Sequence, residues 1–180
     1  RRDEDRKRQE EVREPGAEAW LDHLVAGRIP SVGRIRLTPM LNPAGRLMGD
    51  LTVARLDDDR FWLTGSYYLQ PWHMRWFHQH APGDGVTIEN VTEDHMGFSV
   101  SGPAAREVVA KLTREDLATE AFPFLGVREM EVGRARAVVG RISLTGELGY
   151  EIVVRRDAHR TLWSELQDAG ASAGLRPIGD

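Results

Sequence analysis

Cysteine is absent from this chain of 180 residues. Its absence excludes disulfides, thiolate metal sites and a cysteine nucleophile, and it agrees with a reducing compartment. No apolar run approaches the roughly 20 residues of a membrane helix, so we expect no membrane partner and a cytoplasmic location. A net charge of −4 gives no sign of the clustered basic surface that holds nucleic acid, so we expect no nucleic-acid partner.

Several catalytic and cofactor motifs are also missing. Neither GxGxxG nor GxxxxGK[ST] occurs, so we expect this segment to bind no FAD or NAD through such a loop. The GxSxG elbow of serine hydrolases and the HExxH zinc motif are absent as well. His73, His78 and His80 crowd one predicted helix, but their spacing puts at most two on one side, so we predict no metal site.

The two ends of the sequence suggest a piece of something longer. Residues 1–10 form a charged lead-in, predicted to be helical or disordered, without an initiator Met or the apolar region of a signal peptide. The last residues, GLRPIGD, directly follow a predicted helix and its exit loop. We therefore expect an internal segment that is truncated at both ends.

Four helices are predicted from apolar spacing. The first follows Pro15 and buries Ala17, Trp20, Leu21 and Leu24 on one face. The second, at 71–81, is an aromatic-faced helix whose Trp72, Trp76 and His80 are spaced by four. A third follows Pro103. The last runs from an N-cap at Asp157 to Gly170 as its C′ residue.

Strands are predicted between these helices from β-rich or alternating segments. They are at 33–41, in a hairpin at 51–65 around an acidic turn, at 86–91 and 96–102, in a hairpin about Gly133, and in a hairpin at 141–154. Strands without strict alternation with helices indicate an α+β fold, with antiparallel sheets and helices packed on one face.

Two similar segments within the sequence suggest two related subdomains. EPGAEAWLDHL and GPAAREVVAKL share a strand exit, a proline at the helix start and the same apolar spacing. The same junction also recurs by coincidence in unrelated proteins. We predict two strand-helix lobes, at 11–83 and 84–180.

Two acids stand out as candidate site residues. Asp50 follows a glycine-bearing turn at the start of an apolar strand, where it would be near the core but open to solvent. Glu147 lies at the tip of the last hairpin, between Gly146 and Gly149. The alternative is that both acids merely favour turns.

Several segments together resemble the folate-binding domain of the glycine-cleavage T-protein (aminomethyltransferase) family. They are PGAEAWLDHLVAGRIP, TPMLNPAGRLMGDLTVARL, VSGPAAREVVAKLT, DLATEAFPF, REMEVG and RISLTGELGYEIVV, and the resemblance runs from about residue 12 to residue 180. AFPF and GELGYE look closest to the C-terminal region of dimethylglycine and sarcosine dehydrogenases and oxidases.

This resemblance implies tetrahydrofolate-dependent one-carbon transfer from an N-methyl or aminomethyl donor. Glu147 takes the place of the family's pterin-binding glutamate; the pterin offers two parallel N–H donors, which a carboxylate accepts as a pair. Asp50 takes the place of the essential aspartate near N5 and N10, both catalytic and folate-binding, although Gly49 replaces the first acid of a frequent double acid. Tyr150 would pack at the ring's margin or in the core.

The resemblance further implies a third, barrel-like domain that this chain lacks. It also implies an amine donor as a small-molecule partner, delivered by a carrier protein or by a flavin domain with FAD on a missing upstream segment. Two other functions stay open: a folate-binding module without transfer activity, as in relatives that serve iron–sulfur assembly, and a structural or interaction domain whose tryptophans at 62–76 would meet a partner.

Overall fold

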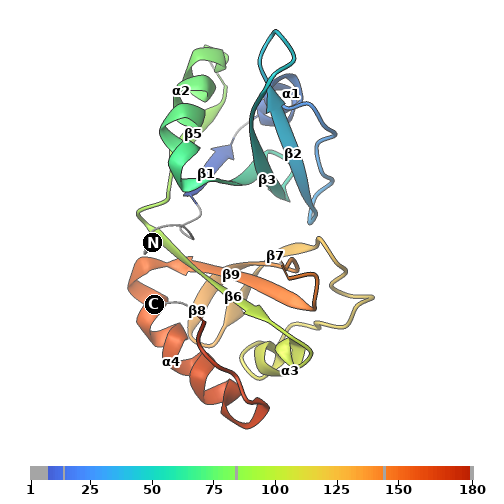
Figure 1. Ribbon diagram of the computed structural model, residues 1–180, viewed down its shortest axis with the longest axis vertical. Helices are drawn as coiled ribbons and strands as arrows, with labels where there is room; N and C mark the ends of the chain where they lie inside the picture. The colour runs from blue at the N-terminus through green and yellow to red at the C-terminus, as the bar shows by residue number, and fades with distance from the viewer. Residues whose placement is uncertain (1–7, 14, 84, 144, 179–180) are drawn as a thin grey trace. The chain divides into compact units, whose positions relative to one another are not determined.

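The computed structural model describes residues 8–13, 15–83, 85–143 and 145–178. They fall into two compact units, of which the first ends at Thr92 and the second begins at Glu93 (Figure 1). Each unit contains one antiparallel sheet with helices packed against it, so the predicted α+β class is confirmed. None of the helices in the described ranges is both long and apolar enough to cross a bilayer.

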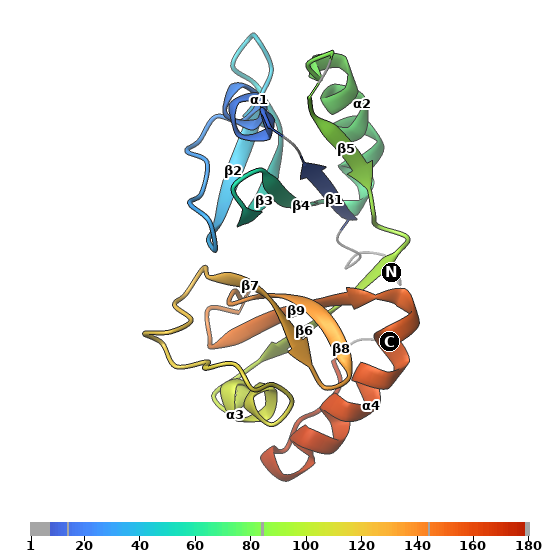
Figure 2. The ribbon, with the colours of Figure 1, turned by 180° about the vertical axis from the view of Figure 1, so that it is seen from behind.

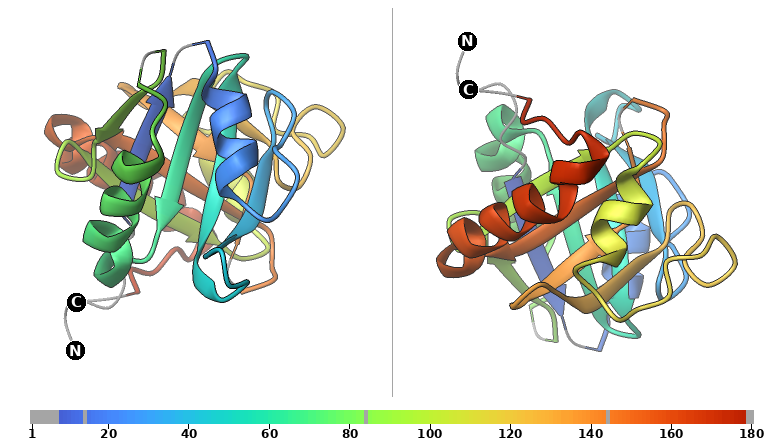
Figure 3. Two further views of the ribbon diagram at one scale, coloured as in Figure 1. Left: turned by 90° about the horizontal axis from the view of Figure 1, so that it is seen from above. Right: turned by 90° about the horizontal axis from the view of Figure 1, so that it is seen from below.

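The first unit is a five-stranded sheet in the order β2-β3-β4-β1-β5. Its strands are β1 (Arg8–Arg13), β2 (Ile35–Leu41), β3 (Leu47–Asp57), β4 (Arg60–Gly65) and β5 (Thr87–Asn90). Its helices are α1 (Ala17–Leu24) and α2 (Gln70–His80), preceded by a 3₁₀ turn at Tyr67–Leu69. Both helices lie over the same face of the sheet (Figure 3, left). Because β5 pairs with β1, this unit extends beyond the predicted boundary at residue 83.

The core of the first unit lies between this sheet and its two helices. The predicted apolar face of α1 is confirmed, because all four of its members are buried. The other buried members of this core are Val12, Val25, Met40, Leu51, Val53, Phe61, Leu63 and Phe77. Trp20 and Phe77 join the two helices by an edge-to-face contact with ring centroids 5.8 Å apart.

The charged lead-in was expected to be helical or disordered, and this prediction is wrong for its last residues. Residues 8–10 begin β1, which pairs with β4 on one side and β5 on the other. Residues 1–7 lie outside the described part of the chain. The charged sequence did not suggest a strand because β1 is held by backbone hydrogen bonds to neighbours on both sides, which do not depend on side-chain type. Its one apolar residue, Val12, is fully buried in the core.

The predicted aromatic face of α2 is not its buried face. The helix buries Gln70, His73 and Phe77, whereas Trp72 is 50% exposed. Trp76 is partly buried, and its ring contacts the tilted ring of His80 with centroids 3.9 Å apart. Of the three tryptophans considered as a partner surface, Trp72 is therefore the exposed one.

The buried His73 makes stability depend on pH. Burial lowers the pKa of His73 below its ordinary value of 6.5, and this outweighs the opposing effects of the Met48 backbone and the Asp50 charge. The unfolded chain therefore takes up a proton near pH 6.5 that the folded chain still excludes. The free energy of unfolding should be highest above that pH, and it should fall as the pH drops from about 6.5 towards the folded-state pKa.

Urea unfolding at pH 7.5, 6.5 and 5.5 measures this dependence. His73→Leu, which cannot titrate, should flatten the decline. Burial also lowers the pKa of His159, as do the nearby Arg160 and Arg156, so His159→Gln should remove the part of the decline that His73 does not cause. An unchanged slope in His73→Leu would contradict the assignment.

The second unit is a four-stranded sheet in the order β6-β9-β8-β7. Its strands are β6 (His95–Ser101), β7 (Val127–Val132), β8 (Ala135–Gly140) and β9 (Gly149–Arg155). Its helices, α3 (Ala105–Ala110) and α4 (His159–Gly170), lie on the same side of the sheet (Figure 2). Its core packs Ala105, Val109, Leu162 and Leu166 of these helices against the strands.

The two units have the same topology. In each, a strand leads through a proline to a helix, and a three-stranded meander and a second helix follow. The sheet orders β2-β3-β4-β1 and β7-β8-β9-β6 correspond strand for strand, with β5 added at the edge of the first. The predicted pair of related subdomains is therefore confirmed, with Pro15 and Pro103 at equivalent junctions.

The ends of α4 differ from the prediction. A 3₁₀ turn at Arg156–Ala158 contains the expected N-cap, Asp157, and α4 begins at His159. Gly170 is the last helical residue, not the C′ residue, and Gly174 takes the left-handed conformation instead. A Cβ at Gly170 would lie 2.5 Å from the Leu175 side chain, so packing explains the glycine there.

Candidate functional site

Glu147 is carried by a loop at 141–148 that joins β8 to β9. The predicted hairpin is therefore only half right, since β9 forms its second arm but residues 141–143 are not a strand and Leu144 lies outside the described residues. Pairing of β8 with β9 stops at Gly140. Beyond it, the Arg141 N–H donates to the Gly126 carbonyl at 2.8 Å, and the Leu125 N–H donates to the Arg141 carbonyl at 2.9 Å. These bonds hold the start of the loop against the segment that precedes β7.

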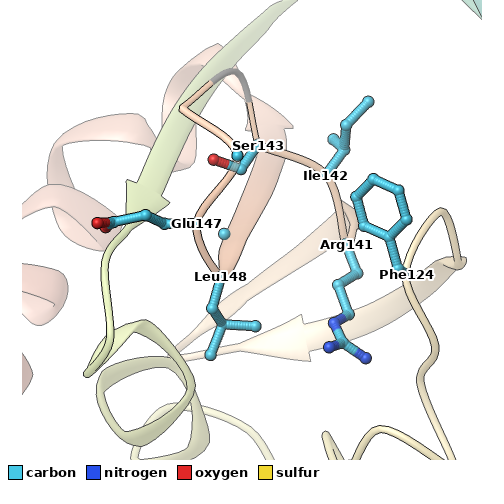
Figure 4. Close-up of a pocket in the computed structure, with 8 residues that line it drawn as sticks. Phe124, Arg141, Ile142, Ser143, Glu147 and Leu148 are labelled. Carbon is cyan, nitrogen blue, oxygen red and sulfur yellow. The ribbon is translucent and has the colours of Figure 1, made fainter.

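A pocket of about 380 Å³ lies between this loop and the segment before β7 (Figure 4). Its lining residues are Phe124, Arg141, Ile142, Ser143, Gly146, Glu147, Leu148 and Gly149. All of them belong to the second unit, so the pocket is complete within it. Its volume falls in the range of small-molecule sites, roughly 300–1,000 Å³.

Short-range hydrogen bonds shape the turn that carries Glu147. The Thr145 N–H donates to Ser143 Oγ at 3.2 Å, and the two hydroxyl oxygens lie 2.8 Å apart. The Gly102 N–H donates to the Leu148 carbonyl at 2.9 Å, which ties the loop to the end of β6. Figure 4 shows the Glu147 side chain at one side of the pocket, directed away from Phe124.

The Glu147 carboxylate is open to a ligand. The side chain is exposed, and no basic side chain among the described residues forms an ion pair with it. Arg141 lines the same pocket, but its Nη1 donates to the Phe122 carbonyl at 2.7 Å. Both Glu147 oxygens can therefore accept hydrogen bonds from an incoming molecule.

Gly146 and Gly149, on either side of Glu147, are glycines for different structural reasons. Gly146 has φ of 78° and open space where a Cβ would stand, so it serves the turn and leaves the backbone accessible. A Cβ at Gly149 would lie 2.6 Å from the Ser143 Cβ and 3.1 Å from the Ile142 carbonyl oxygen. Gly149 is thus required by the loop folding back on β9, and not by the approach of a ligand.

Gly149→Ala should therefore disturb both fold and pocket. We expect a loss of about 1–3 kcal/mol in the free energy of unfolding, the usual cost of overpacking, because the obstructing atoms are backbone or fixed to it. Gly146→Ala should cost about 1 kcal/mol through its left-handed φ alone. Urea unfolding compares the two. A smaller loss for Gly149→Ala than for Gly146→Ala would contradict this packing.

Two pocket residues were not predicted from the sequence. Phe124, the last residue of AFPF, is 57% exposed and lies across the pocket from Glu147 (Figure 4). Arg141 Nε is buried and has no hydrogen-bond partner within the described ranges. The AFPF motif was a usable signal for Phe124, but nothing local marks Arg141.

Tyr150 lies in the core of the second unit. Its side chain is 0% exposed and stacks on Phe122 with ring centroids 6.2 Å apart. Arg106 Nε donates to the Tyr150 hydroxyl at 3.4 Å. Tyr150 is not among the residues that line the pocket, so in this conformation it is a core residue.

Asp50 belongs to the first unit, inside β3. The strand begins at Leu47, so Asp50 is its fourth residue and not its first, as had been expected. It pairs with Pro39 of β2, and its side chain is exposed. Leu51 and Val53 are buried in the core. Alternation therefore puts the Asp50 carboxylate on the opposite face of the sheet from the helices.

The profile of the GCVT N-terminal domain matches residues 3–180. The chain belongs to this family. Its relatives are enzymes of the aminomethyltransferase and dimethylglycine dehydrogenase type, and folate-related one-carbon transfer is the chemistry of the family. The sequence resemblance is thereby confirmed.

Two curated relatives illustrate the match of this GCVT domain. It is 37% identical over 161 residues to the mitochondrial dimethylglycine dehydrogenase of Mus musculus, covering 88% of this chain and 18% of that protein. It is 30% identical over 163 residues to the aminomethyltransferase of Bacillus subtilis, covering 89% of this chain and 44% of that protein. The chain thus spans less than half of either relative.

Solved structures show the same fold. The aminomethyltransferase T of the glycine cleavage system from Bartonella henselae superposes with a TM-score of 0.78 at 21% identity, over 90% of this chain and 43% of that one. A chain of heterotetrameric sarcosine oxidase from Corynebacterium sp. U-96 gives 0.77 at 19% identity, over 97% and 84%.

Within this GCVT domain, the predicted site residues are divided between the units. Glu147 and Tyr150 belong to the second unit, one at the pocket and one in the core beside it. Asp50 belongs to the first unit. The described residues contain no group of three or more acidic or histidine side chains arranged to hold a metal ion.

Proposed function

We propose that this chain is a tetrahydrofolate-dependent one-carbon transfer domain that accepts its one-carbon unit from an N-methyl or aminomethyl donor. The observation that carries the proposal is the exposed Glu147 carboxylate, free of ion pairs among the described residues, at a pocket of about 380 Å³. Family membership supplies the class of chemistry.

The residues around the pocket suit the pterin end of a folate. Its N3–H and 2-amino group are parallel donors, and an ionised carboxylate accepts them as a bidentate pair. Phe124 and Ile142 give the pocket apolar walls suited to a flat ring. Bound tetrahydrofolate would supply the nitrogens that receive the one-carbon unit, and Glu147 would fix the orientation of the ring.

Asp50 is proposed as the catalytic residue. An exposed carboxylate can orient an amine, accept its proton and stabilise positive charge that develops at the reacting carbon. These roles suit Asp50 because its side chain has no ion pair with the described basic residues to compete with a ligand.

The donor would come from outside this chain. Removing a hydride from an N-methyl amine requires an electron acceptor, and the sequence contains no GxGxxG loop to hold one. A flavin domain, or a carrier protein bearing an aminomethyl group, would therefore deliver the one-carbon unit. The dehydrogenase and aminomethyltransferase relatives, both longer than this chain, fit these two modes of delivery.

Ligand binding tests the proposal directly. Titration with 5-formyltetrahydrofolate should raise the unfolding temperature of the chain by roughly 5 °C or more when the ligand is at about 100 times its Kd. Glu147→Gln should reduce the rise. No rise at all, with a circular dichroism spectrum that shows folded protein, would leave a structural or interaction domain as the better account.

A folate-binding module without transfer activity is the second candidate. Gly49 favours it, because a frequent double acid of the resembling family is reduced here to the single carboxylate of Asp50. Such a module would show the same shift of unfolding temperature on binding. It would not form 5,10-methylenetetrahydrofolate from any donor, so turnover separates the two.

A further inference from the structure

Two glycines on neighbouring strands leave a recess that the ring of His73 fills. A Cβ at Gly49 of β3 would lie 2.4 Å from His73 Nε2. A Cβ at Gly65 of β4 would lie 3.2 Å from His73 Nδ1. The ring itself is 0% exposed. Any larger residue at Gly49 would displace either the imidazole or β3.

Hydrogen bonding does not account for this histidine. The Met48 backbone of β3 lies close enough to the ring to raise its pKa, but neither ring nitrogen has a hydrogen bond of ordinary geometry within the described residues. A buried polar ring without a well-formed hydrogen bond is costly, and an apolar side chain would fill the same volume more favourably. Its Phe77 contact, with ring centroids 6.3 Å apart, is a packing contact that an apolar residue would also provide.

The recess lies directly beside Asp50. Gly49 is buried on the helix side of β3, and the next residue projects to the opposite face. The imidazole therefore touches the backbone that carries the carboxylate and not the carboxylate itself. Its position on α2 limits how closely β3 can approach the helix at this point.

We propose that His73 is a positioning residue, which sets the orientation of Asp50 by filling the recess formed by Gly49 and Gly65. This deepens the proposed function, since it rests on Asp50 as the reacting carboxylate. It also predicts a coupling that exists whether or not folate binds: a methyl group at Gly49 and the ring of His73 compete for one space.

The carboxyl ¹³C resonances of the chain, labelled at its aspartates, test that coupling without any ligand. Asp50→Asn assigns the Asp50 signal. Gly49→Ala should move this signal at pH 7.5 by more than the signals of Asp22 and Asp168, which are exposed aspartates of α1 and α4. Adding His73→Ala to Gly49→Ala should return it part of the way, because the lost ring makes room for the methyl group while the strain of a side chain at the Gly49 φ of 156° remains.

Turnover then tests the positioning role. His73→Asn and Gly49→Ala should lower the kcat for methylenetetrahydrofolate formation by ~10-fold or more, while the folate Kd stays within about threefold. Equal losses in kcat and in folate affinity would indicate general unfolding and overturn the proposal. So would an Asp50 signal that stays in place in folded Gly49→Ala, or one that the addition of His73→Ala does not move back towards its original position. Absence of folate binding in the wild type would instead overturn the proposed function and leave the resonance test intact.

Discussion

Asp50→Ala should lower the rate of 5,10-methylenetetrahydrofolate formation by roughly 10²–10⁴-fold, the usual contribution of a positioned proton-transfer group. The affinity for tetrahydrofolate should change by less than about threefold, because Glu147 is the residue proposed to bind the pterin. Stability should change by less than about 0.5 kcal/mol, since the side chain is exposed and has no ion pair with a described basic residue. A continuous assay of the folate product, with an N-methyl donor and its oxidising partner, measures the rate.

Asp22→Ala is the matched control for that experiment. Asp22 is an exposed aspartate of α1 in the same unit, so its loss changes the net charge equally without touching β3. Turnover that survives in Asp50→Ala to within a few-fold of the wild type would remove Asp50 from the chemistry. Turnover that is absent from the wild type, while folate binds, would favour the binding module.

Glu147→Gln should weaken tetrahydrofolate binding by roughly 100-fold, or about 2.7 kcal/mol. The amide keeps one acceptor oxygen, but it loses the charge and presents an NH₂ group where the pterin offers a donor. Hydrogen bonds to a charged group contribute about 1.5–3 kcal/mol each. Because Glu147 is exposed on a turn, the variant should fold as the wild type does. Isothermal titration with 5-formyltetrahydrofolate gives both affinities.

Glu131→Gln provides the comparison for Glu147→Gln. Glu131 is an exposed glutamate of β7 in the same unit and is not part of the pocket lining. It should bind folate as the wild type does. Equal affinities for the wild type and Glu147→Gln would show that the carboxylate does not meet the pterin, and the pocket would lose its assigned ligand.

The helices and the two-unit plan could be predicted because they depend on local patterns. The apolar face of α1 repeats at helical spacing, and the strand-proline-helix junctions at Pro15 and Pro103 mark equivalent places in the two units. The chain turns at Gly133 because a residue with φ of 59° is needed between β7 and β8. Each of these signals lies within a few residues of the structure it specifies.

The errors arose where distant residues decide. β1 forms from a charged segment because β4 and β5 supply its hydrogen bonds. The buried face of α2 is set by Gly49 and Gly65, which accept His73 but would exclude a larger ring. Neither cause can be seen from the segment that it shapes.

The candidate site shows the same division. Glu147 and Asp50 were predicted through resemblance, and local chemistry explained only why acids suit a turn and an exposed strand position. Arg141 was missed because its role depends on Gly126 and Phe122, whose carbonyls it meets through the fold. The reason for Gly149 also required the loop to be seen folding back on Ser143.

The repeated topology places each sheet within one continuous stretch of chain. Every strand of the first sheet leaves the ribosome before any strand of the second. The first unit can therefore form its core during synthesis, before the second unit has been made. Its slowest step should be the insertion of β1, the earliest strand made, between two later ones, β4 and β5. Among the described residues of the second half, the earliest strand has no such inner position: β6 stands at the edge of its sheet and pairs with β9. The two units thus share one topology but should differ in the step that limits their folding.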